Sequence, residues 1–249
     1  MRRWSIRLAL AFGLLLLSLL IARSALSKPL PTGAVGPAAE ALADAILSSV
    51  NAAAWEQTGA VRWRMSSHEH LWDRQRSLAR VRTGDTEVLV ELGSAQGRAF
   101  RDGEELQGRA ARKAVEKGYA AWVNDAFWLA APTKLRDDGT TRALISTEQG
   151  DALLVSYASG GLTPGDAYLW RVDADSRPSA WSLWVSVIPI GGVTISWEGW
   201  QPLSTGAMVS TRHQVVGHPK LAFSLEDVAG AATLAELEPG PDPFAALNP

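Results

Sequence analysis

The sequence predicts an α+β protein built on one wide antiparallel sheet, with one helix before the sheet and a second helix in the middle of it. Three observations carry this prediction. Short segments of alternating apolar and polar residues recur along the chain, turn signals separate them about every ten residues, and most neighbouring segments have no helix of crossover length between them. We expect about ten strands, and a sheet of that width tends to curl or close because its strands twist. Its concave side must then be filled by the two helices or stay partly open.

The N-terminus has the features of a targeting segment. Residues 1–7 carry Arg2, Arg3 and Arg7, and residues 8–22 (LALAFGLLLLSLLIA) form an uncharged apolar run. This run is shorter than the roughly 20 residues that a spanning helix needs and fits the core of a signal peptide. We therefore expect residues 1–27 to be a signal peptide, or alternatively an uncleaved signal anchor that ties the protein to the inner membrane. Both readings place the remaining chain across that membrane, in the periplasm or secreted.

After a linker at residues 28–36 (KPLPTGAVG), residues 37–228 are predicted to form the folded domain. Pro37 begins a short amphipathic helix, in which Leu42 and Ile46 share one face. Residues 60–65 (AVRWRM) then alternate between apolar and basic side chains, as a half-buried strand does. Further alternating segments lie at residues 70–73, 78–82, 87–92, 98–101, 141–146, 152–157, 167–172, 180–188, 192–197 and 208–216. The proline-rich residues 229–249 are predicted to be a disordered tail.

The second helix is predicted from about residue 108 to residue 131 and contains the most informative stretch of the chain. In residues 119–139 (YAAWVNDAFWLAAPTKLRDDG), apolar residues fall at 119, 122, 123, 126, 127 and 130, which is helical spacing with one apolar face. Pro132 ends the helix, and Asp137, Asp138 and Gly139 favour a turn. Such an aromatic helix either fills a core or lines a pocket for a hydrophobic ligand.

Composition excludes several classes of protein. The formal net charge of −2 gives no support to nucleic-acid binding, which requires a basic surface, so no nucleic-acid partner is expected. The chain has no cysteine. Disulfides, thiolate metal sites, a cysteine nucleophile and a lipidated N-terminal cysteine are therefore all excluded.

The sequence contains no recognisable catalytic motif. His68 and His70 would lie on the same face of a strand, a spacing that a metal ion can use, and His213 is the candidate third ligand from another strand. No sequence spacing links His213 to this pair, so we expect neither a metal nor another cofactor. Paired carboxylates such as Glu104–Glu105 and Asp137–Asp138 fall in predicted turns, where they are solvated or cap the backbone. We therefore expect no catalytic residues and a protein that is not an enzyme.

The aromatic residues are the most informative set. The chain has 11 tryptophans, and most of them fall in the predicted second helix and the predicted strands. Most of them can be ordinary core residues, but a single layer of core has difficulty accommodating so many indole rings. We expect the surplus to line a concavity for an apolar ligand. The predicted ligand-binding residues are Trp63, Trp72, Trp122, Phe127, Trp128, Trp170 and Trp184.

Several sequence blocks together resemble the periplasmic lipoprotein carriers of the LolA and LolB superfamily, and more closely a bacterial branch of it. The most specific blocks are VNDAFWLAAPTKLRDDG at residues 123–139 and LTPGDAYLWRVDADS at residues 162–176. Supporting blocks are AAWEQTGAVRWRM, HLWDRQRSLARVR, AFRDGEEL and VTISWEGWQPLSTGAMVSTRH. Together the matching segments cover roughly residues 38–228 of the chain.

The resemblance implies an unclosed β-barrel: a strongly curved antiparallel sheet whose concave face is covered by helices. In the carriers, a hydrophobic cavity between sheet and helices receives lipid acyl chains. This chain departs from LolB because it lacks the cysteine that carries the lipid anchor, and no arginine aligns with the one that LolA uses to hand over its cargo.

We therefore expect an exported, non-enzymatic protein that holds a lipid or another hydrophobic ligand between sheet and helix, in lipid or lipoprotein trafficking. The alternative is a membrane-anchored structural or sensory domain of the cell envelope, with a filled cavity, that binds a protein partner. A third reading, a hydrolase of envelope lipids or glycans, would require a role for His68, His70 or His213.

Overall fold

The computed structural model describes residues 27–159 and 164–247 of the chain. The predicted signal segment lies almost wholly in residues 1–26, outside the described residues. Within the described part, no helix is both long enough and apolar enough to cross a membrane.

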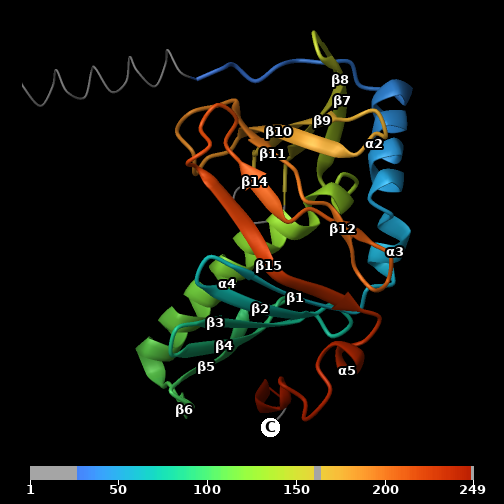
Figure 1. Cartoon of the computed structure of the whole chain (residues 1–249). Coiled ribbons are helices and arrows are strands. Elements are labelled where there is room, and N and C mark those ends of the chain that lie inside the picture. The colour runs from blue at the N-terminus through green and yellow to red at the C-terminus, as the bar shows by residue number, and fades with distance from the viewer. Residues whose placement is uncertain (1–26, 160–163, 248–249) are drawn as a thin grey trace, which may run out of the picture.

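Most strands of the protein belong to a large antiparallel sheet (Figure 1). Each strand pairs with its neighbours in antiparallel register, and β1 to β6 form a meander connected by tight turns. In spatial order, the eight strands are β14 (Arg212–Gln214), β15 (Ala222–Ala231), β1 (Ala60–Met65), β2 (His68–Asp73), β3 (Leu78–Thr83), β4 (Thr86–Glu91), β5 (Gln96–Arg101) and β6 (Glu104–Glu105).

A second, small sheet lies at the other end of the molecule (Figure 1). Its five strands, in spatial order, are β11 (Val193–Ser196), β10 (Pro178–Trp184), β9 (Ala167–Val172), β8 (Gly150–Tyr157) and β7 (Thr140–Thr147). β12 (Gln201–Pro202) and β13 (Met208–Val209) form a separate two-stranded ribbon.

Two isolated bridges connect the small sheet to the large one. Ile195 pairs with Val215, and Glu198 pairs with Arg212, so β11 and β14 meet without forming a continuous ladder. The expectation of a single sheet is therefore corrected: a strongly twisted sheet of this width splits at its weakest pairing. The predicted α+β class is confirmed, with large antiparallel sheets that do not close into a barrel.

The first helix lies beside the small sheet and begins where the sequence predicts. α2 (Pro37–Ser49) has Pro37 in its first turn, where the missing N–H costs nothing, and it buries Ala39, Ala43 and Ile46. It packs against β7 and β8 and is followed by α3 (Ala52–Glu56). The remaining helical segments are α4 (Gly108–Ala130), η1 (Ala131–Thr133), α5 (Leu234–Leu237) and η2 (Ala245–Leu247).

The long helix α4 runs diagonally from the large sheet toward the small one (Figure 1). Its first half packs on β3, β4 and β5 through residues such as Val115. Its second half contacts both sheets: Leu129 packs with Val61 of the large sheet, whereas Phe127 packs with Trp181 of the small sheet. The second half of α4 is therefore the common centre of the two hydrophobic cores.

The chain beyond residue 228 is ordered as far as residue 247, which differs from the predicted disordered tail. β15 continues to Ala231, and Phe244 is fully buried against Leu71, Leu78 and Leu89 on the face of the large sheet opposite α4. Composition suggested disorder, but the segment is held by this buried ring, by an ion pair between Arg76 and Asp242 and by a hydrogen bond from Arg98 to the carbonyl of Ala246.

The predicted linker at residues 28–36 also has fixed partners. The backbone N–H of Lys28 donates to the carbonyl of Gly191 at 2.9 Å, and Ala34 exchanges two backbone hydrogen bonds with Leu144 of β7. This segment therefore runs along the small sheet rather than separating two independent units.

Candidate functional site

The candidate site is the contact between β2 and the second half of α4. His68, His70 and Trp72 alternate along β2 and therefore project from one face of the strand, toward α4. Trp122 and Asp125, three positions apart on α4, project back toward them. We call these five residues the α4–β2 seam.

Asp125 is the centre of the seam. Its Oδ2 atom lies 2.8 Å from Nδ1 of His68 and 2.8 Å from Nε2 of His70. Its other oxygen, Oδ1, accepts a hydrogen bond from the side-chain amide of Asn124 at 2.8 Å. The side chains of His70 and Asp125 are 0% and 4% exposed, whereas that of His68 is 32% exposed and connects the seam to solvent.

Burial and hydrogen bonding determine the protonation of the seam. Burial lowers the pKa of His70 below its usual value, although the Asp125 carboxylate opposes this shift. Burial alone would raise the pKa of Asp125, but hydrogen bonds from His70, Asn124 and His68 outweigh it and lower that pKa. The buried pair at neutral pH is therefore a neutral imidazole beside a carboxylate anion.

The ring of His70 is held in place by Trp63 on the neighbouring strand. The two rings stack with their centroids 4.5 Å apart and their planes at 16°. Trp63 and His70 are direct partners in the β1–β2 register, which explains the stacking. Nδ1 of His70 is buried and has no hydrogen-bond partner among the described protein atoms.

Chemically, the seam brings together two imidazole nitrogens and a carboxylate oxygen. One ligand atom from each of His68, His70 and Asp125 lies within 4.8 Å of the others. Two histidines and one carboxylate are a donor set that binds first-row transition metals such as zinc.

The predicted common face of His68 and His70 is confirmed, because both rings reach the same oxygen atom. His213, the candidate third ligand, lies elsewhere: its Nδ1 donates to the carbonyl of Ser196 at 3.1 Å, and its ring contacts Trp128 and Phe223. Asp125 was not predicted from the sequence. The sequence feature that could have indicated it is the position of this carboxylate next to the apolar face of the predicted helix. A charged group is buried there only when hydrogen-bonding or oppositely charged groups accompany it.

The structure divides the predicted ligand-binding aromatics among three places. Trp63, Trp72 and Trp122 lie on the side of α4 that faces the large sheet, and the rings of Trp72 and Trp122 meet edge to face at 5.2 Å. Phe127, Trp128 and Trp170 belong to the core of the small sheet. Trp184 packs on the opposite face of that sheet, where its indole N–H donates to the carbonyl of Lys28.

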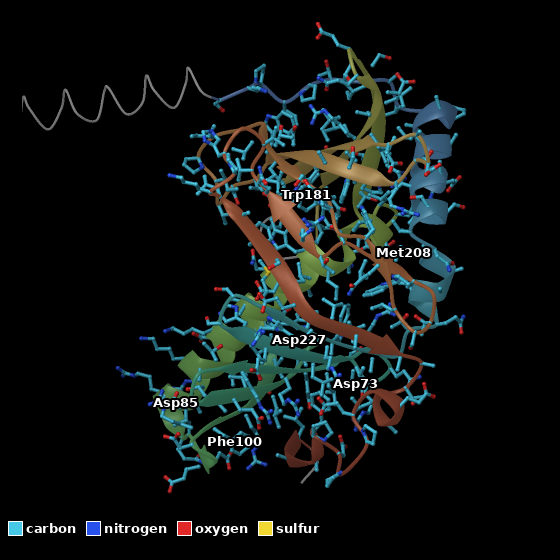
Figure 2. All side chains as sticks on the ribbon, in the orientation of Figure 1. Asp73, Asp85, Phe100, Trp181, Met208 and Asp227 are labelled. Atoms are coloured by element: carbon cyan, nitrogen blue, oxygen red, sulfur yellow. The ribbon has the colours of Figure 1, made fainter. Side chains whose placement is uncertain are left out.

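The core of the small sheet is an aromatic cluster of Trp128, Trp170, Trp181 and Trp197, with Trp181 at its centre. Figure 2 labels Trp181 among the strands of the small sheet. The centroid of the Trp181 ring lies 4.9 Å from that of Trp128, 4.7 Å from that of Trp170 and 4.9 Å from that of Trp197. Three of the four rings are fully buried and only Trp128 keeps partial exposure. Their mutual contacts fill the space between α4 and the small sheet.

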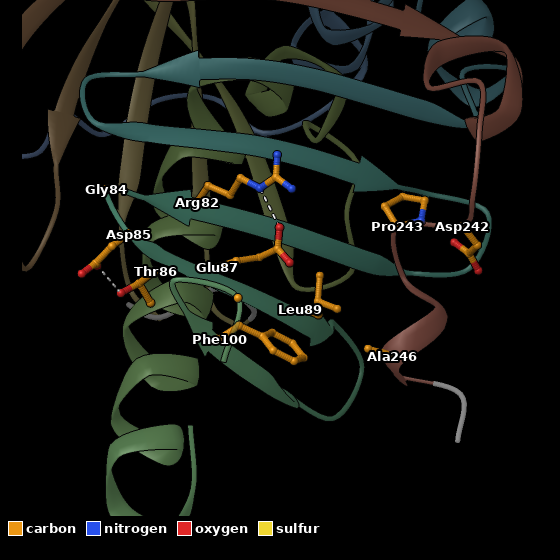
Figure 3. Close-up of a pocket in the computed structure, with 11 residues that line it drawn as sticks. Arg82, Gly84, Asp85, Thr86, Glu87, Leu89, Phe100, Asp242, Pro243 and Ala246 are labelled. Carbon is orange, nitrogen blue, oxygen red and sulfur yellow. Dashed lines mark hydrogen bonds and ion pairs between the residues drawn. The ribbon is translucent and has the colours of Figure 1, made fainter. Parts of the chain in front are cut away.

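Two open hollows lie on the face of the large sheet that points away from α4. The larger, of about 520 Å³, is bordered by β3 to β5 and by the C-terminal segment (Figure 3). Its walls include Arg82 paired with Glu87, together with Leu89 and Phe100. The smaller, of about 230 Å³, is lined by arginines and acids of β1 to β3 and β15 and by Glu238. The lining of the smaller hollow also includes Trp63 and His70, so this hollow adjoins the seam, whereas no seam residue lines the larger one.

The fold and the site together define an α+β protein in which one helix joins two curved, unclosed antiparallel sheets. No protein-family model and no curated protein matches the chain. Among solved structures, it is distantly similar to the crystal structure of a DUF1329 family protein from Desulfovibrio piger. That likeness has a TM-score of 0.38 and 8% sequence identity, and it covers 81% of this chain and 97% of the other.

Proposed function

We propose that this chain is an exported, non-enzymatic binding protein that takes a lipid or another hydrophobic ligand between the large sheet and the second half of α4. The observation that carries the proposal is the Trp72–Trp122 pair. Both rings are only half-buried, although they face each other across the interior of the fold. Large apolar rings that remain partly exposed beside a core are typical of a ligand-lined surface.

The polar atoms of the interior support an amphipathic ligand. The indole N–H groups of Trp63 and Trp122 are buried without a hydrogen-bond acceptor among the described protein atoms. A buried donor without an acceptor costs about 1–3 kcal/mol. The ester or carboxyl oxygens of a lipid would supply such acceptors, while its acyl chain contacts the rings.

Ligand entry requires α4 to move away from the large sheet, because the interior is closely packed. The resemblance to lipoprotein carriers of the LolA and LolB type agrees with this proposal, since their ligands lie between sheet and helices. Acyl chains of lipids or lipoproteins are therefore the proposed cargo. The periplasm is the proposed location, which the N-terminal targeting features support.

The absence of cysteine from the chain allows a direct test. A Cβ atom at position 118 of α4 would lie 2.9 Å from Cβ of Val88 on β4, and the two must move apart to the roughly 3.8 Å of a disulfide for the bond to form. In the reduced double variant Gly118→Cys/Val88→Cys, added fatty acids should quench the tryptophan fluorescence in a saturable way. In the oxidised variant, the disulfide should abolish this quenching. Restoration of the response by a reducing agent provides the internal control.

Two tryptophan variants locate the ligand. Trp122→Ala should weaken fatty-acid binding about tenfold or more, whereas Trp184→Ala, on the far face of the small sheet, should leave the affinity unchanged. Equal effects of the two substitutions, or binding that is indifferent to the disulfide, would contradict entry beneath α4.

The second candidate is an envelope structural or sensory domain whose interior stays filled and which binds a protein partner. The close mutual packing of Trp170, Trp181 and Trp197 favours it, because each ring is at most 2% exposed. This reading predicts no saturable lipid response in either redox state of the double variant. It also predicts that one envelope protein is cross-linked reproducibly to the chain in intact cells.

A further inference from the structure

We propose that His68, His70 and Asp125 bind a divalent first-row transition metal ion, which joins β2 to the second half of α4. This proposal rests on the polar residues of the seam, whereas the lipid proposal rests on Trp72 and Trp122, so the two are tested separately. A metal ion requires several donor atoms that converge on one point from a rigid scaffold. The seam provides them from a strand and a helix that are both packed into the core.

The donor set selects the kind of metal. Imidazole nitrogens favour zinc, copper, nickel, cobalt or iron, whereas calcium and magnesium prefer sites made of oxygen alone. Three protein ligands leave at least one coordination position open in a tetrahedral site. Because His68 is 32% exposed, the open position can be filled by solvent.

The geometry needs only a small adjustment. Ligand atoms about 2.1 Å from a tetrahedral zinc ion are separated by about 3.4 Å from each other. Both nitrogen–oxygen separations in the seam are 2.8 Å. Both separations must therefore lengthen by about 0.6 Å, which a shift of the Asp125 carboxylate away from both rings provides.

The surroundings orient the donors. Asn124 holds the second oxygen of Asp125, and Trp63 fixes the plane of the His70 ring by stacking. Such outer contacts are a usual component of metal sites. Metal binding at Nε2 replaces the contact of this atom with Asp125 and moves the imidazole proton to Nδ1, which has no partner among the described protein atoms, so the metal bond must offset that cost.

The competing account is a hydrogen-bonded cluster that never holds a metal. In that account, the two imidazoles serve only to neutralise and solvate a buried carboxylate. The two accounts differ in a measurable way, because only a metal site binds one equivalent of a transition ion through His68.

The test uses tag-free protein stripped with a chelator and titrated with Co²⁺ and then with Zn²⁺. Calorimetry gives stoichiometry and affinity, and the visible absorption of Co²⁺ reports nitrogen and oxygen ligation. We expect one equivalent to bind, Zn²⁺ to displace Co²⁺, and saturating Zn²⁺ to raise the unfolding temperature. His68→Gln should weaken the affinity by more than about 100-fold, beyond the loss typical of an outer-shell partner.

The chain offers a matched control in His218, an exposed histidine outside the seam. His218→Gln should bind both ions as the unmodified protein does. Asp125→Asn alters a buried group, so its metal affinity is interpreted only if its circular dichroism spectrum matches that of the unmodified protein. If the spectrum differs, the test rests on His68→Gln. The proposal is overturned if the unmodified protein binds no stoichiometric metal, or if His68→Gln and His218→Gln have the same affinity.

Discussion

Gly118 of α4 lies directly against Val88 of β4, so closely that an added Cβ atom would be 2.9 Å from both the Cβ and a Cγ atom of that valine. Glycine weakens a helix interior by roughly 1 kcal/mol relative to alanine, so this position has a packing reason. The close approach seats the first half of α4 on the large sheet and fixes the angle at which the second half enters the core.

We therefore predict that Gly118→Ala lowers the free energy of unfolding by about 1–3 kcal/mol, despite the better helix propensity of alanine. Val88 is rigid and cannot turn away, because its side chain is branched at Cβ. Urea unfolding measures the loss. The same substitution in a Val88→Ala background should cost at least about 1 kcal/mol less, and a cost that is equal in both backgrounds would refute steric contact as the cause.

Stability should depend on pH through His213. Burial lowers its pKa to about 4 in the folded protein, from 6.5. Between these two values the unfolded chain binds a proton that the folded protein does not, so stability is lost as pH falls from about 6.5 toward 4. Relative to a His213→Gln variant, the protein should lose about 2–3 kcal/mol between pH 7 and pH 4.5. A difference between the two proteins that does not change with pH would contradict a buried neutral imidazole.

The C-terminal segment should contribute substantially to stability through Phe244. Because this ring is 0% exposed, Phe244→Ala should cost about 3–5 kcal/mol in guanidinium unfolding. Val187→Ala, at a side chain that is 74% exposed, is the control and should change stability by less than about 0.5 kcal/mol. A loss below about 1 kcal/mol for Phe244→Ala would mean that the segment does not dock on the sheet in solution.

Substitutions at Asn51 distinguish the contributions of backbone strain and of side-chain hydrogen bonds to stability at the start of α3. It has a φ of 51°, its Oδ1 accepts from the N–H of Ala54, and its Nδ2 donates to the carbonyl of Gly206 at 3.1 Å. Asn51→Gly loses both side-chain hydrogen bonds but adopts the left-handed backbone conformation freely. Asn51→Ala loses the same hydrogen bonds and is destabilised by about a further 1 kcal/mol, because alanine is strained in that conformation. Thermal unfolding should rank the alanine variant below the glycine variant, and the reverse order would show that the left-handed backbone is not maintained.

The sequence carried enough information for the class of fold and for its main helices. Alternation in residues 60–65 reflects burial on one face, which periodicity records directly. The apolar spacing of residues 119–130 predicted the helix, although its second half is buried against both sheets rather than on one face. The split between β11 and β14 could not be predicted, since it depends on accumulated twist rather than on any local pattern. The docking of Phe244 was missed because composition averages over a segment and overlooks one decisive side chain.

Only the strand half of the candidate site, His68 and His70, could be predicted from the sequence. The spacing of His68 and His70 is local to one strand, so their common face followed from the sequence. Asp125 comes from a helix 55 positions away from His70, and only the tertiary fold brings the two together. For the aromatics, the sequence indicated an excess of rings but could not distribute them between the two flanks of α4 and the far face of the small sheet.

The pairing of β1 with β15 constrains the order in which the protein can fold. Ala60 lies opposite Ala231, so one edge of β1 stays unpaired until roughly 170 further residues have been synthesised. At ribosomal speeds this interval is roughly 10–30 s, during which an apolar strand edge is unpaired. The nascent chain is therefore most vulnerable to aggregation late in synthesis, and any factor that shields it must act until β15 has emerged.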